Sequence, residues 1–190
     1  MKDIIDISDW QEGIDFDAVK DAGIEGVIIK IAEGTTETNC FETYVEECEA
    51  RNIPWGVYCF THATETGLAE AEAEACITYL GGRKPALGVW FDVDTDAPEV
   101  IAVGDVTDIC SAFICKMNDA GYSCGVYAGY YTFRDNIHTD QLADYVPYWI
   151  SQYDPTCDFN EVSNGHLSCW QYSSTGYIGD TNVDLDYWYD

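Results

Sequence analysis

The chain has 190 residues, of which 47% are apolar, and this is enough for one domain with a sizeable core. Asp and Glu number 35 against 8 Lys and Arg, so the formal net charge is −27. Such a surface repels phosphate polymers and anionic lipids, and the basic residues never cluster, so nucleic acid and membranes are not expected partners. No apolar run reaches the roughly 20 residues of a membrane span, and acids stand near the start where a secretory signal needs an apolar core.

Short strand-like runs alternate with helical ones through the first two thirds of the chain, which predicts βα units and a mostly parallel sheet. The predicted strands there are residues 3–8, 26–32, 55–60, 87–94 and 125–128, and the predicted helices are residues 15–22, 41–51, 65–80 and 105–120. Further on, residues 148–151, 168–172 and 183–186 are strand-like, but no good helices separate them.

These elements predict an α/β fold, an irregular and flattened TIM-like (β/α) barrel with some helices missing on its second half. The length supports this, because a full eight-fold barrel typically needs about 250 residues. With no linker, repeat or low-complexity tract in the sequence, we expect one domain over residues 1–190.

The nine cysteines are an odd number, and most are expected to be reduced. Cys59 and Cys124 lie in apolar strand-like runs and suit small buried hydrophobes. Cys157 and Cys169 lie in looser sequence, and the sequence leaves their pairing open. No CxxC occurs, so a zinc site of ordinary spacing is not expected, and neither is another cofactor.

Carboxylates and aromatic residues dominate the predicted carboxyl ends of the strands, where parallel α/β folds gather functional groups. Asp92 and Asp94 are two apart on a strand and therefore face the same side. Two close carboxylates do not both ionise freely, so one can hold a proton while its neighbour stays charged, as glycosidic cleavage requires. The alternatives are that these acids ligate a cation or lie in a solvated loop.

Six Trp and fourteen Tyr supply flat faces on which sugar rings stack. Phe60 and Trp55 are expected to fill the core. For four others the sequence leaves a place in the barrel wall and a place in a cleft equally open: Tyr58, Tyr127, Trp149 and Trp170. The three histidines have no partner spacing and receive no catalytic role.

An ordered set of short motifs resembles glycoside hydrolase family 25, the N-acetylmuramidase lysozymes. They are residues 6–8 (DIS), 10–16 (WQEGIDF), 29–34 (IKIAEG), 56–58 (GVY), 91–94 (FDVD), 125–127 (GVY), 148–153 (YWISQY), 170–173 (WQYS), Gly179 and 183–186 (VDLD). Each is weak alone, but their order over one domain length is specific.

The resemblance implies an irregular βα barrel that cleaves the β-1,4 bond between N-acetylmuramic acid and N-acetylglucosamine in bacterial peptidoglycan. By position, Asp6, Asp92 and Asp184 match the family's active-site aspartates, and Asp94 matches its catalytic acid. Asp94 would protonate the glycosidic oxygen, Asp92 would support the substrate's 2-acetamido group, and Asp6 and Asp184 would hold that pair. The residues expected to bind substrate are Glu33, Tyr58, Tyr127, Trp149, Tyr153, Trp170 and Gln171.

Two positions depart from the family pattern. The family usually has Glu where this chain has Asp94, and the shorter carboxyl lies roughly 1.5 Å farther back, a misplacement that can cost about 10²-fold in rate. Cys59 stands where many members have His.

Because Asp94 stands where the family usually has Glu, two alternatives to an efficient muramidase follow. One is a catalytically weakened module that binds peptidoglycan or chitooligosaccharides, and the other is a hydrolase of chitin or a modified muropeptide. An anionic wall would repel this chain at low salt, so we expect either a separate wall-binding domain or action at moderate salt. A monomer is expected, acting outside the cell or at the cell wall, as a secreted enzyme with its leader trimmed or as a phage endolysin.

Overall fold

The structure is a computed structural model, and it describes residues 1–93 and 106–189. Eight strands close into a barrel in the order β1-β9-β8-β7-β6-β5-β4-β2, and β1 pairs with β2 to complete the ring. Their bounds are β1 Lys2–Ile7, β2 Val27–Glu33, β4 Trp55–Phe60, β5 Val89–Asp92, β6 Cys124–Gly129, β7 Pro147–Ser151, β8 His166–Ile178 and β9 Thr181–Trp188, while β3 (Thr36–Glu37) pairs with β2 outside the ring. The predicted α/β barrel is confirmed.

Strand β9 is the exception to the parallel arrangement of the ring. It pairs antiparallel with β1 on one side and with β8 on the other, whereas the other neighbours in the ring are parallel. Antiparallel strands need only a short connection, so β8 and β9 form a long hairpin without a crossover helix. This hairpin is where the barrel departs from a regular succession of βα units.

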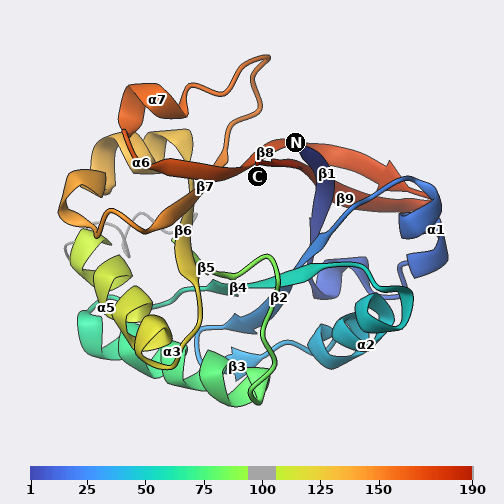
Figure 1. The fold of residues 1–190 in the computed structure, drawn as a ribbon, viewed down its shortest axis with the longest axis horizontal. Helices are drawn as coiled ribbons and strands as arrows, with labels where there is room; N and C mark the ends of the chain where they lie inside the picture. The colour runs from blue at the N-terminus through green and yellow to red at the C-terminus, as the bar shows by residue number, and fades with distance from the viewer. Residues whose placement is uncertain (94–105, 190) are drawn as a thin grey trace.

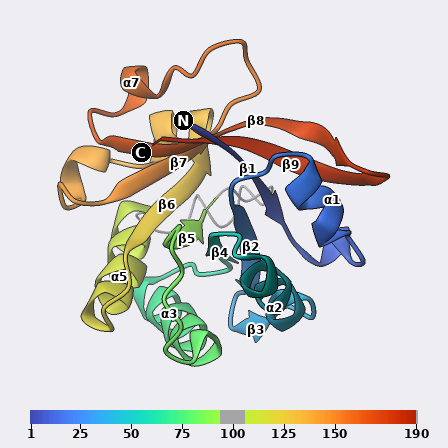
Figure 2. The ribbon, with the colours of Figure 1, turned by 45° about the vertical axis from the view of Figure 1, so that its right-hand side comes forward.

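The longer helices cover one side of the barrel, as Figures 1 and 2 show: α2 (Phe41–Arg51), α3 (Thr66–Leu80) and α5 (Val106–Asp119) lie together below the strands in these views, with α1 (Phe16–Asp21) at the right. The later connections carry only α6 (Tyr130–Asn136) and α7 (Phe159–Val162), and the one-turn elements are η1 (Asp9–Gln11) and η2 (Thr139–Gln141). The expected shortage of helices on the second half agrees with this arrangement, although the short α6 and α7 were not predicted.

Local signals in the sequence account for the helix ends. At α1, the Asp15 carboxylate accepts hydrogen bonds from the backbone N–H groups of Asp17 and Ala18, which caps the first turn. Gly81 ends α3 in the left-handed conformation at φ 58°, where a side chain would be strained.

Two apolar clusters stabilise the fold. The larger lies between the sheet and its helices, where Phe91 of β5 stacks on Phe113 of α5 with ring centroids 4.2 Å apart. The smaller fills the inside of the barrel and contains Ile4, Ile28, Leu87, Trp90, Tyr127, Trp149 and Cys169. Among the described residues, the part of the barrel interior that holds this cluster is therefore packed with side chains.

All nine cysteines are free thiols, including Cys157 and Cys169. Cys59 and Cys124 are buried, as their strand-like surroundings predicted. Within the described residues, no helix combines the length and apolarity needed to cross a membrane.

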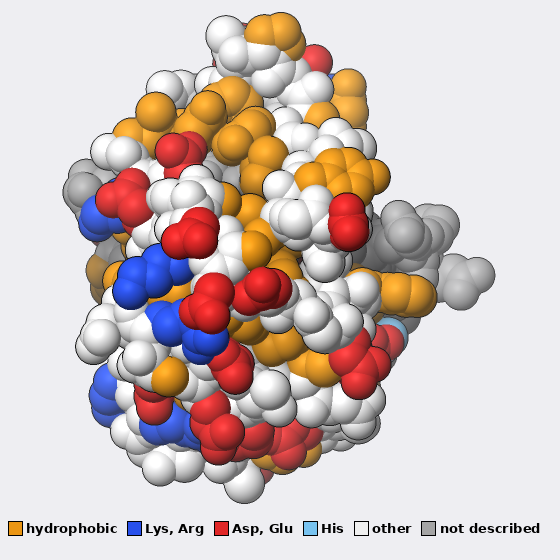
Figure 3. Space-filling view, turned by 90° about the vertical axis from the view of Figure 1, so that its right-hand side faces the viewer, with side chains coloured by type: hydrophobic (Ala, Val, Ile, Leu, Met, Phe, Trp, Pro, Cys, Tyr) orange, Lys and Arg blue, Asp and Glu red, His pale blue; other side chains and the backbone are white. Residues whose placement is uncertain are grey.

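Acidic and basic side chains are intermixed on the face that carries α1 and α2 (Figure 3). Arg51 there pairs with Asp17 at 2.7 Å and with Glu47, and Arg83 pairs with Glu42 at 2.6 Å. The few basic residues thus compensate individual acids, and the net charge remains strongly negative.

Candidate active site

The mouth of the barrel holds a hollow of about 480 Å³. Its lining comes from the end of β1, the following turn η1, β4 and the start of β9, and consists of Asp6, Ile7, Ser8, Trp10, Gln11, Tyr58, Asn182 and Asp184. Because β9 runs antiparallel to β1, its first residues meet the carboxyl end of β1. Two acids far apart in the sequence are thereby brought to one place.

Asp6 and Asp184 are directly opposite each other in the pairing of β1 with β9. Asp6 is only 7% exposed, while Asp184 is half-buried at the edge of the hollow. Asp186 is on the same face of β9, two residues further along and opposite Ile4, and it is fully buried. Three carboxyl groups therefore lie on the inner side of two adjacent strands.

Gln171 of β8 connects this acid cluster to the other side of the barrel. Its Nε2 donates to Asp6 Oδ2 at 2.7 Å and to Asp184 Oδ2 at 3.2 Å. Its Oε1 accepts the hydroxyl groups of Tyr127 at 2.9 Å and Tyr153 at 2.8 Å. The amide is satisfied on both ends, which holds both carboxylates in a defined orientation.

The acids of the cluster retain protons to unusually high pH. Burial raises the pKa of Asp6 well above its ordinary value, and the charges of Asp186 and Asp184 raise it further. Burial also raises the pKa of Asp184 to about 6 and that of Asp186 to about 7. Charged carboxylates are costly in a site with little water, so near neutral pH this cluster carries fewer charges than carboxyl groups.

Asp92 lies at the carboxyl end of β5 and is 6% exposed. Its register partners are Phe60 of β4 and Tyr127 of β6. Burial, with the nearby charges of Asp92 and Asp6, raises the pKa of both Tyr58 and Tyr127, so these phenols stay protonated. Asp94, the expected catalytic acid, lies outside the described residues.

The expected substrate-binding aromatic residues occupy four different positions. Tyr58 lines the hollow, and Trp149 lies beneath it in the barrel interior, with its ring centroid 4.2 Å from that of Tyr127. Tyr153 is 57% exposed, and its hydroxyl reaches inward to Gln171.

Trp170 is on the opposite face of the sheet from Gln171, because adjacent residues of a strand alternate. Its indole donates to the Gln152 carbonyl at 2.8 Å, and the ring packs in the outer core. The structure does not bring Trp170 into the hollow.

Glu33 is set apart from the acid cluster. It accepts a hydrogen bond from Lys30 at 2.8 Å and is 3.1 Å from the His62 ring, and these contacts lower its pKa. It lines a neighbouring hollow with Asp9 and His62 rather than the one at Asp6.

Trp10 is a site residue that the sequence did not single out as functional. It lines the hollow yet is 91% exposed. A capping box holds its turn, in which Ser8 Oγ accepts from the Trp10 N–H and Gln11 Oε1 accepts from the Ser8 N–H. Gln11 also donates to the Asn182 carbonyl at 3.1 Å, which ties the turn to β9. The signal was available, because an S-x-x-Q capping box after a strand displays the residues of its turn.

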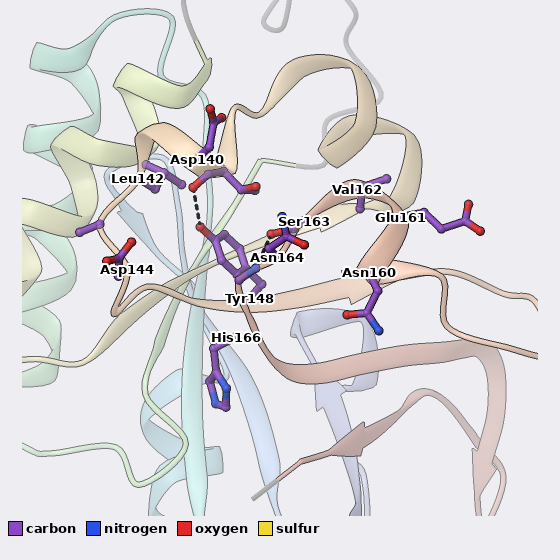
Figure 4. Close-up of a pocket in the computed structure, with 13 residues that line it drawn as sticks. Asp140, Leu142, Asp144, Tyr148, Asn160, Glu161, Val162, Ser163, Asn164 and His166 are labelled. Carbon is purple, nitrogen blue, oxygen red and sulfur yellow. Dashed lines mark hydrogen bonds between the residues drawn. The ribbon is translucent and has the colours of Figure 1, made fainter.

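A larger hollow of about 750 Å³ lies away from the acid cluster, between η2 and the segment around α7 (Figure 4). Tyr148 crosses it and donates to the Thr139 carbonyl at 3.5 Å. It contains none of the expected site residues, and it begins beside the start of β7 and β8 rather than at the strand ends that carry the acids. We therefore place the candidate site at Asp6.

In the part of the chain that the structure describes, no group of three or more His, Cys, Asp and Glu side chains has an arrangement suited to a metal ion. The acids at the barrel mouth instead contact Gln171, Trp149 and one another.

The sequence model of one family, glycosyl hydrolases family 25, matches residues 5–181, nearly the whole chain. The chain belongs to this family. Family 25 membership agrees with the barrel fold, and it confirms the resemblance seen in the motifs.

Relatives of this family 25 chain are lysozymes. The autolytic lysozyme of Clostridium acetobutylicum is 28% identical over 96% of this chain and 54% of its own length. The lysozyme of Streptococcus phage Cp-9 is 31% identical over 95% of this chain and 53% of its own. The chain spans about half the length of these curated relatives.

The fold of the chain is also that of a solved autolysin. The modular autolysin LytC from Streptococcus pneumoniae, solved with a synthetic peptidoglycan ligand, matches 99% of this chain and 46% of its own with a TM-score of 0.86 and 23% identity. At this identity the match shows the barrel fold alone.

Proposed function

We propose that this chain is a peptidoglycan-degrading muramidase that hydrolyses the β-1,4 bond between N-acetylmuramic acid and N-acetylglucosamine. The observation that supports it most is the hydrogen-bonded set of Asp6, Gln171 and Asp184 at the mouth of a family 25 barrel. Buried acids with raised pKa values beside an open hollow are suited to a site in which one carboxyl group stays protonated, as glycosidic cleavage requires.

In the proposed reaction, Asp94 donates its proton to the glycosidic oxygen as the bond to the anomeric carbon breaks. The substrate's own 2-acetamido oxygen closes on that carbon, with Asp92 orienting it and balancing its developing positive charge. A water molecule then attacks the anomeric carbon and opens the ring that the acetamido group has formed. The proton that this water loses returns to the Asp94 carboxylate. Asp6 and Asp184 hold the pair of Asp92 and Asp94 in orientation and keep the proton distributed correctly within that pair.

The substrate's sugar rings would lie along the aromatic groups of the mouth. Tyr58, Tyr153 and Trp10 line or border this opening and present flat faces with polar edges. We propose peptidoglycan as the partner and the cell wall as the place of action, in line with the autolytic and phage lysozymes among the relatives. Their greater length is consistent with a separate wall-binding domain.

The test is to incubate the protein with purified peptidoglycan and to follow both turbidity and new reducing ends. Asp94→Asn should abolish hydrolysis, and Asp94→Glu should retain or raise it. Asp21→Asn, at an exposed carboxylate on α1, serves as the control and should be as active as the parent chain. Activity that survives Asp94→Asn would assign the acid to another residue.

The Asp at position 94 favours one second candidate, a module that binds the glycan without cleaving it efficiently. Its shorter carboxyl reaches less far toward the glycosidic oxygen than the family's Glu. Tight binding to wall fragments or chitooligosaccharides, with no reducing ends from any wall type or from chitin, would support this candidate over the muramidase.

A further inference from the structure

Asp186 is the carboxyl group of the acid cluster to which neither the residues matched to the family's site nor the proposed reaction assigns a role. It is fully buried on the inner face of β9. Its Oδ1 accepts the indole N–H of Trp149 at 2.8 Å and the thiol of Cys169 at 3.7 Å. A carboxyl placed this deep in a protein is costly unless it has a specific partner.

The other oxygen of Asp186 has no such donor. Among residues 1–93 and 106–189, no N–H or O–H group of the chain donates to Asp186 Oδ2, which is fully enclosed. Asp186 is the diagonal neighbour of Asp6 on the inner face of the β1–β9 pair, close enough for the charge of Asp186 to raise the pKa of Asp6. Two carboxyl groups contact each other favourably only when a proton lies between them, because two carboxylates repel.

We propose that Asp186 is a positioning residue that shares one proton with Asp6 and so fixes the orientation and charge of Asp6 during glycan hydrolysis. The pair then carries one negative charge instead of two. Each member keeps its own donors, Gln171 on Asp6 and Trp149 on Asp186, so the shared proton occupies the remaining contact. The role in hydrolysis rests on the proposed function, whereas the shared proton does not.

The surroundings of the pair also favour a single negative charge. Groups near it come from several strands: Asp184 on β9, Gln171 and Cys169 on β8, Trp149 on β7, Tyr127 on β6 and Tyr58 on β4. Asp92 on β5 lies near these two tyrosines. The charged members of this set are acids, and Lys30 on β2 pairs with Glu33 instead. Adding a second charge to the pair would raise the repulsion within this set, and burial leaves little solvent to screen it.

Burial raises the pKa of Asp186 to about 7 and that of Asp6 well above its ordinary value, so the pair keeps at least one proton until the pH rises above about 7. In the unfolded chain an Asp is deprotonated from about pH 4 upward. The folded state therefore binds the extra proton, and its stabilising effect is present at low pH and lost as the pH rises through the folded pKa. The folded protein should accordingly be less stable at pH 8 than at pH 5.

Asp186→Asn tests the proposal, because the amide reproduces the protonated carboxyl in shape. Its oxygen can accept from Trp149 while its NH₂ donates to Asp6 with a hydrogen that is not lost at high pH. We expect kcat at pH 5.5 within about threefold of the parent chain, and the midpoint of the alkaline limb of the pH–rate profile shifted upward by at least one unit. Asp186→Ala, which removes the donor altogether, should lower kcat at least tenfold at every pH.

Urea unfolding at pH 5 and pH 8 gives an independent measurement that needs no substrate. The loss of stability between these pH values should be clearly smaller in Asp186→Asn than in the parent chain, and unchanged in the exposed control Asp21→Asn. A pH–rate profile or a pH dependence of unfolding that superimposes on that of the parent chain would overturn the proposal. A parent chain that hydrolyses no wall, yet shows the expected change in unfolding, would refute the muramidase function and keep the shared proton.

Discussion

Gln171 Nε2 lies 2.7 Å from Asp6 Oδ2 and joins β8 to β1 across 165 residues of sequence. The Oε1 atom of the same amide accepts hydrogen bonds from the Tyr127 and Tyr153 hydroxyl groups. One side chain therefore sets the positions of groups on four strands or strand ends. Because both partners are buried, the loss of this amide would leave charged and polar atoms without hydrogen bonds.

Gln171→Leu should therefore lower the free energy of unfolding by about 1–3 kcal/mol and kcat/KM on peptidoglycan by at least tenfold. It should also raise the pKa of Asp6 further, because the amide hydrogen bond lowers that pKa. Urea unfolding and reducing-end assays between pH 4 and 8 measure both effects. Gln152→Leu is the matched control, a buried Gln that bonds Asp158 instead, and it should lower stability without shifting the pH profile.

Trp149→Phe removes the indole donor to Asp186 and should raise the pKa of that carboxyl above about 7. The variant should lose about 1–3 kcal/mol of stability. The loss should be larger at pH 8 than at pH 5, because the Asp186 carboxylate that forms at high pH has lost a donor.

Trp90→Phe offers the comparison for this variant. Trp90 is equally buried, but its indole donates to the Leu87 carbonyl, which does not titrate. In urea unfolding, Trp90→Phe should lower the free energy of unfolding by the same amount at pH 5 and at pH 8. Equal pH dependence in the two variants would contradict the role assigned to the Trp149 hydrogen bond.

Trp10→Ala should leave the fold intact and weaken substrate binding. The side chain is 91% exposed, so the free energy of unfolding should change by less than about 0.5 kcal/mol. If the indole stacks on a sugar ring, its removal should cost about 0.5–1.5 kcal/mol, or about two- to tenfold in KM with little change in kcat. Tyr145→Ala, an exposed aromatic residue outside the lining of the hollow, should leave KM unchanged.

Gly125→Ala should destabilise the barrel by about 1–3 kcal/mol or more. A Cβ at this position on β6 would lie 2.6 Å from Trp90 Cζ3 and would also clash with the Pro147 carbonyl oxygen. Gly67→Ala in α3 meets no atom within 4 Å and should stabilise the protein by about 0.5–1 kcal/mol. Thermal unfolding of the two variants would show opposite shifts; a neutral Gly125→Ala would contradict the close packing inside the barrel.

The parallel strands of the barrel could be predicted from the sequence because most of them are short apolar runs bounded by turn residues, whereas the sequence indicated only parts of the long β8 and β9. Residues 55–60 and 41–51 form the strand and helix that their patterns indicated. Carboxylates were also expected at the carboxyl ends of the strands, and Asp6 and Asp92 are buried there. The same alternation in the VDLD motif could have pointed to Asp186 beside Asp184, because residues two apart share a face.

The sequence by itself determined which residues form strands and which of them alternate together, since these are local properties of a few neighbouring residues. Only the tertiary structure decided which acids meet and how deeply each is buried. The antiparallel placement of β9 beside β1 sets Asp184 against Asp6 and carries Asp186 deeper into the barrel, next to Trp149. Alternation places Trp170 and Gln171 on opposite faces of β8, but only the closure of the barrel decided that Gln171 faces the acids and Trp170 the outer core. Burial and hydrogen bonding across strands, which control the protonation of this site, depend on contacts between distant segments that no local pattern encodes.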